Sequence, residues 1–403
     1  MKNTLALICI TGLLATACND QPVDTTDPNI PLNNQIYYTS TNNSPIEPNL
    51  FDSKGDNDWG VNISSNTYEE GKGILTFDGD ITAISQAAFY DRATLKTIFL
   101  PSTLEEIGSE AFYRCSELWS VNLPSKITEI KSHTFYGCKN LRQINLHNNI
   151  TKIDAGAFRD CENLGTIIIP DQVTTIREYA FRKCTGAVLT IIPNSVTSLG
   201  TEAFLGPKGK LIVNCDIPKY AFKGCYFTEV YIGDEVTSVG TGAFINNANL
   251  QAVHIQAEDI EIDYQNTFIG CHNLELIDSK FATEDGRCLI LDGTLFAFAP
   301  AGITDYTIPN NTTIIANEIF NGCDELQSIT IPESVTKIGD YAFANCTNLT
   351  SIYCKSSSIP SIGYEILRHH HLDLKIYVPE DKIKLYKRKW HNYANLFVPY
   401  NFE

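Results

Sequence analysis

Cysteine is the residue in this chain whose type and spacing could carry chemistry, since a thiolate can act as a nucleophile, bind a metal ion or form a disulfide. Eight of the 13 cysteines lie three positions after a phenylalanine. They are Cys115, Cys138, Cys161, Cys184, Cys225, Cys271, Cys323 and Cys346. Catalytic and metal-binding cysteines occur singly or in small clusters, so eight cysteines in one repeating frame indicate an architectural role.

The phenylalanines of this frame define an internal repeat. In order they are Phe89, Phe112, Phe135, Phe158, Phe181, Phe204, Phe222, Phe244, Phe268, Phe320 and Phe343. The interval between neighbours is constant from Phe89 to Phe204, shortens before Phe222, widens before Phe320 and returns to its first value at Phe343. Self-similarity with a period of about 23 residues is typical of repeat architectures.

One copy, "LWSVNLPSKITEIKSHTFYGC" from Leu118 to Cys138, contains the elements of each unit. Leu118, Val121 and Leu123 alternate as in a strand with one buried face, and the strand ends at Pro124 because proline cannot donate to the ladder. "ITEI" predicts a second short strand, and the segment before the phenylalanine has room only for a single helical turn. Stacked copies can bury apolar residues that one copy cannot. The sequence therefore predicts an α/β repeat solenoid, rich in β-strand and with short helical turns.

In such a solenoid the eight cysteines occupy one position of the coil. Asn247 takes the same place after Phe244, and both residue types can donate a hydrogen bond. We expect a structural ladder of buried thiols that donate weakly to backbone carbonyls. Disulfides are the alternative, but side chains stacked in register keep their Cβ atoms near the coil spacing, which exceeds the ~3.8 Å of a disulfide. No C-x-x-C pair supports zinc, and we expect no metal and no cofactor.

The unit "IPxSVTxIGxxAFxxCxxLxxIxI" resembles the leucine-rich repeat of the BspA-like surface lipoproteins of Bacteroidetes and related organisms. The resemblance covers roughly residues 80–354. It implies a leucine-rich-repeat solenoid and a cell-surface binding protein, with adhesion to host extracellular matrix in some relatives. It implies no catalytic residue, and the variable surface positions of such a scaffold set its ligand.

The N-terminal segment "MKNTLALICITGLLATAC", from Met1 to Cys18, is organised as an export signal. Lys2 precedes an apolar run from Leu5 to Ala15 that is too short to span a membrane. The ending "LLATAC" resembles a bacterial lipoprotein processing site, which implies a signal peptide over residues 1–17 and lipidation of Cys18. It departs from that pattern at Ala15, where leucine is most common. The alternative is a plain signal peptide cut after Ala17.

Residues 18–35 are polar and acidic, and they predict a flexible, solvated tether between the lipid and the folded body. In some gut and oral bacteria, acidic residues after the lipidated cysteine favour display on the cell exterior. We therefore expect a protein that is lipid-anchored in the outer membrane and displayed on the cell surface. Its only contact with the membrane would be this N-terminal lipid.

Other segments outside the frame predict the ends of the solenoid and one insertion. Residues 36–79 predict a β cap, and residues 80–354 the leucine-rich-repeat solenoid. Within it, residues 279–311 place two alternating segments around Asp292-Gly293, which predicts an inserted β-hairpin, with a ligand-gripping loop as the alternative. Residues 355–403 predict a C-terminal cap whose basic residues form a solvated face.

The repeat frame also indicates where a binding surface would lie. In each L-x-x-I-x-I strand, the residue between the last two apolar positions faces solvent. The resulting row mixes aromatic, apolar and small polar residues and is nearly free of charge, which suits contact with protein or glycan. From this row the candidates are Phe99, Asn122, Asn145, Ile168, His254, Thr330 and Tyr353; the neighbouring row adds Ser120 and Gln143, and Trp119 lies beside them. The alternative is that these residue types merely suit a solvent-facing sheet.

Charge and motifs argue against several functions. The chain has 30 lysines and arginines and 47 acidic residues, a net charge of −17, so nucleic acid is not an expected partner. We find no phosphate-binding loop, no G-x-S-x-G and no H-E-x-x-H motif. Adjacent residues point in different directions, so His369–His371 are not expected to hold a metal. We expect no catalytic residues.

These observations predict a non-catalytic cell-surface lipoprotein whose solenoid binds a macromolecule. An adhesin-like interaction with a host extracellular-matrix protein, a mucin or another cell is the first hypothesis. The alternative is a periplasmic or envelope scaffold that holds another envelope component. An enzyme, or a glycan-binding accessory of one, would need an acid/base or nucleophile constellation that the sequence does not display.

Overall fold

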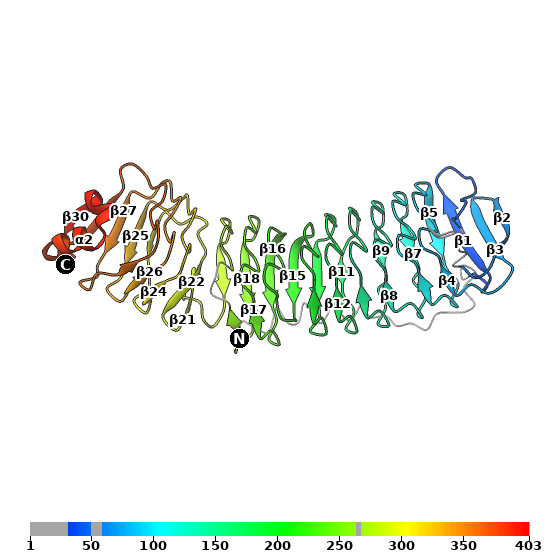
Figure 1. Cartoon of the computed structure of the whole chain (residues 1–403), viewed down its shortest axis with the longest axis horizontal. Coiled ribbons are helices and arrows are strands. Elements are labelled where there is room, and N and C mark those ends of the chain that lie inside the picture. The colour runs from blue at the N-terminus through cyan, green and yellow to red at the C-terminus, as the bar shows by residue number, and fades with distance from the viewer. Residues whose placement is uncertain (1–30, 50–58, 263–266, 403) are drawn as a thin grey trace.

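The chain folds into an elongated stack of coils with antiparallel strands at one end and a short helix at the other (Figure 1). The computed structural model describes residues 31–49, 59–262 and 267–402. Most coils contribute one strand to each of two rows, and neighbouring coils pair in parallel. The repeating unit of the sequence is therefore one turn of a solenoid.

The first row forms three sheets along the stack. The first contains β5 (Leu95–Phe99), β7 (Ser120–Val121) and β9 (Gln143–Ile144). The second contains β11 (Ile167–Ile168), β13 (Leu189–Ile192), β15 (Lys208–Val213), β16 (Tyr226–Ile232), β18 (Ala252–Ile255) and β20 (Leu276–Asp278). The third contains β23 (Asp305–Thr307), β25 (Ser328–Ile331), β27 (Ser351–Cys354), β29 (Lys375–Pro379) and β30 (Phe397–Tyr400).

The second row consists of shorter strands that follow the first-row strand of each coil. Its strands are β4 (Ala83–Ile84), β6 (Glu106–Ile107), β8 (Glu129–Ile130), β10 (Lys152–Ile153), β12 (Thr175–Ile176), β14 (Ser198–Leu199), β17 (Ser238–Val239), β19 (Glu261–Ile262), β24 (Ile314–Ile315), β26 (Lys337–Ile338) and β28 (Ser361–Ile362). In almost every strand the isoleucine or valine faces inward and its neighbour faces outward. This alternation gives the short strands one buried face each.

The N-terminal end of the stack is covered by antiparallel strands. β1 (Gln35–Ser40) pairs with β5 on one side and with β3 (Lys72–Phe77) on the other, and β3 also pairs with β2 (Ile63–Glu69). Strand β1 thereby uses the backbone groups that the edge of β5 would otherwise expose.

The centre of the stack is a column of phenylalanine rings. From Phe89 to Phe204, consecutive ring centroids are 5.1 to 5.4 Å apart, with planes within 10° of parallel. Between Phe204 and Phe222, where the interval in the sequence shortens, the centroid distance grows to 6.3 Å and the rings tilt by 39°. Stacking resumes from Phe222 to Phe268, with centroids 5.4 and 5.5 Å apart, although the intervals there are not constant. The strongly shortened interval before Phe222 therefore coincides with the one tilted contact in the series from Phe89 to Phe268.

The turn that carries each phenylalanine is hydrogen-bonded to the next coil. Glu110, Phe112 and Arg114 donate their N–H groups to the carbonyls of Ser132, Thr134 and Tyr136 at 2.7–3.0 Å. Glu110 and Arg114 have positive φ angles, and the same two positions recur with positive φ along the stack. These segments are single turns, too short to form a lasting helix, which roughly fits the single turn that the sequence predicts here.

Helix in the described ranges is confined to the C-terminal end. The α-helix α2 (Ile383–Lys389) is flanked by the 3₁₀ segments η1 (Glu380–Lys382) and η2 (His391–Leu396). It packs Tyr386 and the following Trp390 into the core, where both rings contact Phe397. The architecture is thus a repeat solenoid of strands with little helix. Across the described residues, no helix is both long and apolar enough to cross a membrane.

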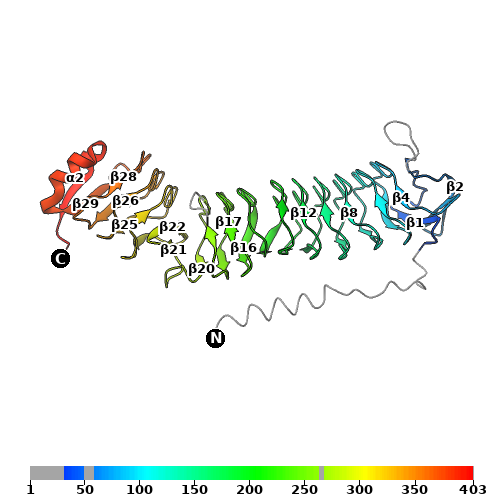
Figure 2. The same ribbon diagram turned by 60° about the horizontal axis from the view of Figure 1, so that its bottom comes forward.

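The column of coils is interrupted within residues 279–311. Strands β21 (Cys288–Leu291) and β22 (Thr294–Phe298) pair antiparallel across Asp292 and Gly293, which both have positive φ as a type I′ turn requires. Strand β22 then pairs in parallel with β24. Figure 2 shows this hairpin between β20 and the C-terminal coils. Its apolar residues are divided between two core clusters, so the hairpin takes the place of a coil and joins both cores.

Candidate functional site

The cysteines at the repeated position are buried and not disulfide-bonded. Seven of the eight donate Sγ–H to the carbonyl of the phenylalanine in the preceding coil at 2.9–3.3 Å. Asn247 replaces a thiol and donates its side-chain N–H to the carbonyls of Phe222 and Phe244. Cys323 makes no such bond within the described structure, and its coil is the first after the hairpin. In these seven coils the thiol therefore satisfies a buried carbonyl.

Burial also suppresses the reactivity of these thiols. Loss of solvation raises the pKa of Cys271 and Cys346 to about 12, and the pKa of the other ladder cysteines is raised for the same reason. The thiolate is the nucleophile and the metal ligand, and it is not populated at neutral pH at such a pKa. The ladder is a structural element of the core.

We expect the native protein to resist alkylation at all 11 cysteines that the structure describes, because each is buried and protonated. Quantification of thiols with a chromogenic disulfide reagent, before and after unfolding in denaturant, checks this. Leu372→Cys is a matched control, because Leu372 is 95% exposed and a thiol there should react at once. Unfolded, unreduced protein that shows almost no free thiol would contradict the ladder and require disulfides.

The three consecutive histidines each have a separate local partner. His369 Nδ1 lies 2.9 Å from Asn345 Oδ1, His370 Nδ1 lies 2.8 Å from the Leu367 carbonyl, and His371 Nδ1 accepts from the Asp373 amide. Among the described residues, no group of three or more His, Cys, Asp and Glu side chains is placed to hold a metal ion.

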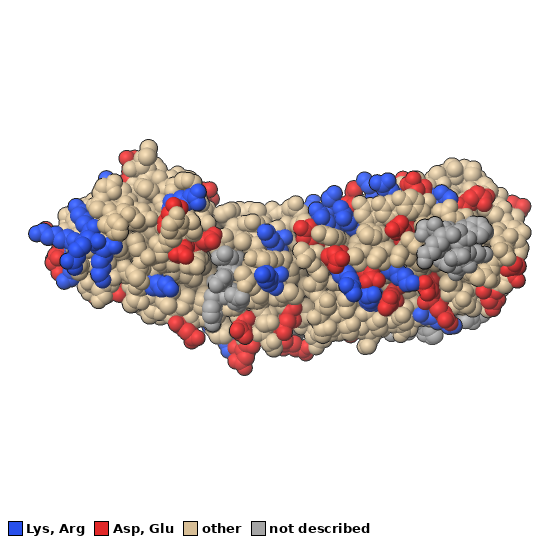
Figure 3. All heavy atoms as spheres, viewed as in Figure 1, with Lys and Arg blue, Asp and Glu red and all other residues tan. Residues whose placement is uncertain are grey.

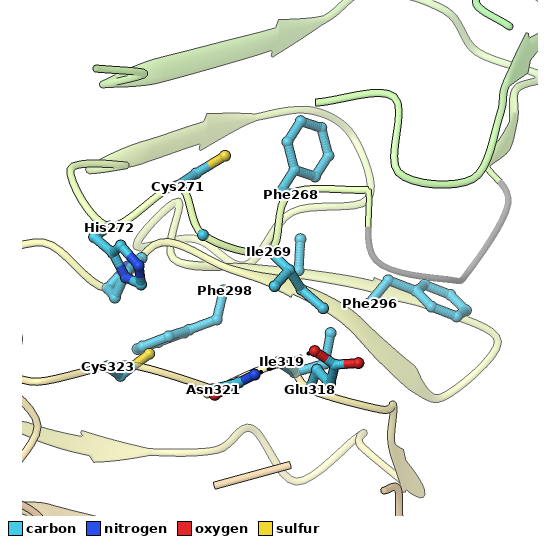
Figure 4. A pocket seen from close by; sticks show the side chains of 13 residues that line it. Phe268, Ile269, Cys271, His272, Phe296, Phe298, Glu318, Ile319, Asn321 and Cys323 are labelled. Atoms are coloured by element: carbon cyan, nitrogen blue, oxygen red, sulfur yellow. Dashed lines mark hydrogen bonds between the residues drawn. The ribbon is translucent and has the colours of Figure 1, made fainter. Parts of the chain in front are cut away.

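A small hollow lies where the first core meets the hairpin and the second core (Figure 4). Phe268 and Cys271 project from one side, and Phe298 and Cys323 from the other. Glu318 is the one carboxylate among its lining residues. The hollow marks the break in coil stacking.

The outward surface of the first-row strands contains the predicted binding-face residues. None of them is fully buried, and Trp119 is 49% exposed. Ser120 and Gln143 are partners in adjacent strands, with Trp119 beside them. Asn122 does not present a free amide, because its side chain bonds both the N–H and the carbonyl of Leu100.

The structure adds to this surface three residues that are not among the candidates named from the sequence. Strand register places Ile191, Ile212 and Tyr231 in one continuous row between Ile168 and His254. The Tyr231 ring stacks on the His254 ring, with centroids 4.5 Å apart. Ile191 lies as far after Phe181 as Ile168 lies after Phe158, so the frame could have found it. The shortened spacing before Phe222 shifts Ile212 and Tyr231, and the alternation in "LIV" and "EVYI" was the signal that could have found those two. We call Ile168, Ile191, Ile212, Tyr231 and His254 the central row.

Charged side chains lie beside the central row. Lys210 Nζ and the Tyr231 hydroxyl both bond Glu229 Oε2 at 2.8 Å, and His254 Nδ1 lies 3.0 Å from Asp278 Oδ2. Partial burial acts to raise the pKa of Glu229, but the hydrogen bonds from Lys210 and Tyr231 outweigh it and the pKa is lowered. The carboxylate is therefore ionised at neutral pH and serves as a fixed cross-strand partner.

Two further features lie near the C-terminal end. On the outward face of the third sheet, strand register places Tyr353 between Thr330 on one side and Tyr377 on the other. Lysine and arginine side chains gather over α2 (Figure 3), where Lys384, Lys387, Arg388 and Lys389 are exposed. The one ion pair recorded for the basic residues of η1 and α2 joins Lys382 to Asp381.

Comparison with known proteins agrees with this architecture. The model of the BspA type leucine-rich repeat region matches in six copies, over residues 74–209, 214–284 and 294–396. The search of curated proteins gives no match.

Among solved structures, a leucine-rich repeat protein from Bacteroides ovatus is 21% identical, with 89% of this chain and 99% of that chain covered and a TM-score of 0.54. A leucine-rich cell-surface protein from Faecalibacterium prausnitzii is 27% identical over 72% of this chain and 86% of its own, with a TM-score of 0.35. The pneumococcal vaccine antigen PcpA is 17% identical over 84% and 87%, with a TM-score of 0.40. The fold is shared with the first of these, and the repeat model matches well over half of the sequence. The chain therefore belongs to the BspA type leucine-rich repeat family.

Proposed function

We propose that the protein is a cell-surface lipoprotein that binds a macromolecule through the outward face of its first-row sheets, without catalysis. The partner would be a host extracellular-matrix protein, a mucin or a surface protein of another cell. The observation that carries the proposal is the central row, a continuous series of apolar and aromatic side chains held on adjacent strands. Contiguous exposed apolar residues bordered by polar ones are typical of protein interaction sites.

The physical basis of binding would be a rigid, nearly uncharged surface. Backbone ladders on both sides hold each inner strand of the second sheet, so little conformational entropy is lost on association. Aromatic and β-branched side chains at the centre supply buried apolar area, while Lys210, Glu229 and Asp278 form a polar border. The export signal and lipoprotein site of the sequence support display outside the cell.

Protease treatment of intact cells tests the location. A surface protein should be digested while a periplasmic control protein stays intact. Full protection on cells, together with digestion of the purified protein, would instead support an envelope scaffold and would direct the search to periplasmic partners.

Binding to a panel of purified matrix proteins and mucin tests the surface. The triple variant Ile168→Thr, Ile191→Thr and Ile212→Thr keeps β-branched residues in the strands but removes apolar area, so we expect at least about tenfold weaker binding. Val188→Thr is the matched control, because Val188 is 65% exposed and lies outside the central row. Equal loss in both variants, or no loss in the triple variant, would contradict this surface.

A further inference from the structure

The outward face of the third sheet carries two rows of side chains that run across β23, β25, β27 and β29. One row consists of Thr307, Thr330, Tyr353 and Tyr377 in direct register. The other consists of Asp305, Ser328, Ser351 and Lys375. Large aromatic side chains thus occupy half of the first row, and short hydroxyl side chains occupy the other half.

The stacking of the tyrosine rings leaves one ring face of Tyr353 on the side of Thr330. The Tyr353 and Tyr377 centroids are 4.7 Å apart and their planes differ by 12°. This separation is close to the ~4.8 Å spacing of paired strands, so the two rings follow one another along the direction in which the strands stack. One face of Tyr353 therefore packs on Tyr377, and the opposite face points toward the space above Thr330.

Tyr400 fixes this pair from a different side. Its ring meets Tyr353 and Tyr377 at 71° and 73°, with centroids 5.4 and 5.6 Å away. Such edge contacts hold the two stacked rings in place without covering the second face of Tyr353. In the stacked series, the next ring would lie above Thr330, but threonine is too short to fill that position. The result is a recess on the sheet surface above Thr330, bounded on one side by the face of the Tyr353 ring. We call this recess the step and the Tyr353 ring its wall.

The sheet surface beside the Tyr353 ring, which we call the floor of the step, carries the hydrogen-bonding side chains of Asp305, Thr307, Ser328 and Thr330. Ser328 Oγ donates to Asp305 Oδ1 at 2.6 Å, and Thr304 Oγ1 donates to Asp305 Oδ2 at 2.8 Å. A carboxylate has about four lone-pair sites, so Asp305 can accept further hydrogen bonds. The hydroxyls of Thr307 and Thr330 have no partner among the described residues. Asp305 also lacks an ion pair with any described lysine or arginine, so the step carries a negative charge.

We propose that this step binds a pyranose ring of a neutral glycan. The C–H groups of the sugar would pack on the free face of Tyr353, whose negative π-face attracts their partial positive charge. The sugar hydroxyls around the ring would donate to Asp305 and exchange hydrogen bonds with Thr330 and Thr307. The charge of Asp305 disfavours an acidic sugar, and a flat ring bordered by hydroxyls matches both the wall and the floor. This inference deepens the proposed function by naming a ligand class for one part of the same outward surface.

Binding of the full ectodomain to immobilised neutral and sialylated oligosaccharides tests the proposal. Tyr353→Ala and Asp305→Asn should each weaken binding of the neutral set by about tenfold or more. Tyr364→Ala is the matched control, since Tyr364 is 63% exposed outside this sheet, and it should bind like the parent protein.

The variant Thr330→Tyr tests whether binding is lost because the step is blocked rather than because the protein misfolds. The new ring would extend the tyrosine stack into the step, so the fold should be retained while neutral glycans lose access. Binding confined to sialylated oligosaccharides, no binding to any neutral one, or undiminished binding by Thr330→Tyr would overturn the proposal. A protein that binds matrix protein through the central row but no neutral glycan would overturn this inference alone. Protection from protease on intact cells would instead affect only the surface location.

Discussion

Replacing Phe158 with alanine will lower the free energy of unfolding by about 3–5 kcal/mol, the range found for buried phenylalanines. Phe158 is fully buried, and its ring stacks between Phe135 and Phe181 with centroids 5.4 and 5.1 Å away. Truncation removes the apolar area of the ring and leaves a cavity that two neighbouring coils line. Because each coil contacts only its neighbours, no distant part of the core can move in to fill it.

Urea unfolding followed by circular dichroism measures this loss. The control is Leu372→Ala, which removes a large apolar side chain from an exposed position and should change stability by about 0.5 kcal/mol or less. A loss below about 1 kcal/mol for Phe158→Ala would mean that the coils close over the missing ring, which contradicts a core made of rigid stacked phenylalanines.

The sequence predicts the interior of this protein better than its surface. Each coil must bring its phenylalanine over the previous one, so the interior appears in the sequence as a constant interval from Phe89 to Phe204. The position of Phe158 follows from that interval alone. Outward residues have no such constraint, since a solvent-facing position tolerates many residue types.

The central row shows where prediction from spacing fails. Ile212 and Tyr231 lie on either side of the shortened interval between Phe204 and Phe222, so counting from the phenylalanine places them out of register, whereas Ile191 keeps the same distance from Phe181 as Ile168 does from Phe158. Strand pairing restores the register, because parallel ladders between β13, β15 and β16 align these residues regardless of turn length. The number of residues in a turn can differ from coil to coil, whereas the hydrogen-bond pattern of the parallel ladder stays the same.

Two other residues show the same limit. Tyr377 belongs to the C-terminal cap of the sequence, where the Phe–Cys frame is absent, yet β29 continues the ladder from β27 and places Tyr377 beside Tyr353. Asn122 fits the pattern of an exposed binding residue, but its amide completes the hydrogen bonding of the Leu100 backbone. Only the geometry distinguishes an amide that is available to a ligand from one that is already paired.

Replacing Cys18 with alanine will move almost all of the protein from the detergent phase to the aqueous phase in a phase-separation assay. Cys18 lies outside the described residues, so this expectation rests on the "LLATAC" sequence and the proposed lipidation of its cysteine. Each buried CH₂ of an attached acyl chain contributes about 0.8 kcal/mol to membrane binding, and stable anchoring takes more than one chain or signal. The net charge of −17 supplies no electrostatic attraction to an anionic membrane, so the acyl chains would provide the whole anchor.

Cys9→Ala is the matched control for this experiment. Cys9 lies within the apolar run of the signal, so its loss should leave export, processing and membrane retention unchanged. If the Cys18→Ala protein still partitions into detergent after its signal peptide is removed, the anchor is not a lipid on Cys18. Retention of the uncut signal would show itself as a larger protein on a gel, which separates a processing failure from true anchoring. A lipid on Cys18 is supported only when the variant is cut, folded and released, because only then has the membrane contact been removed without a change in the solenoid.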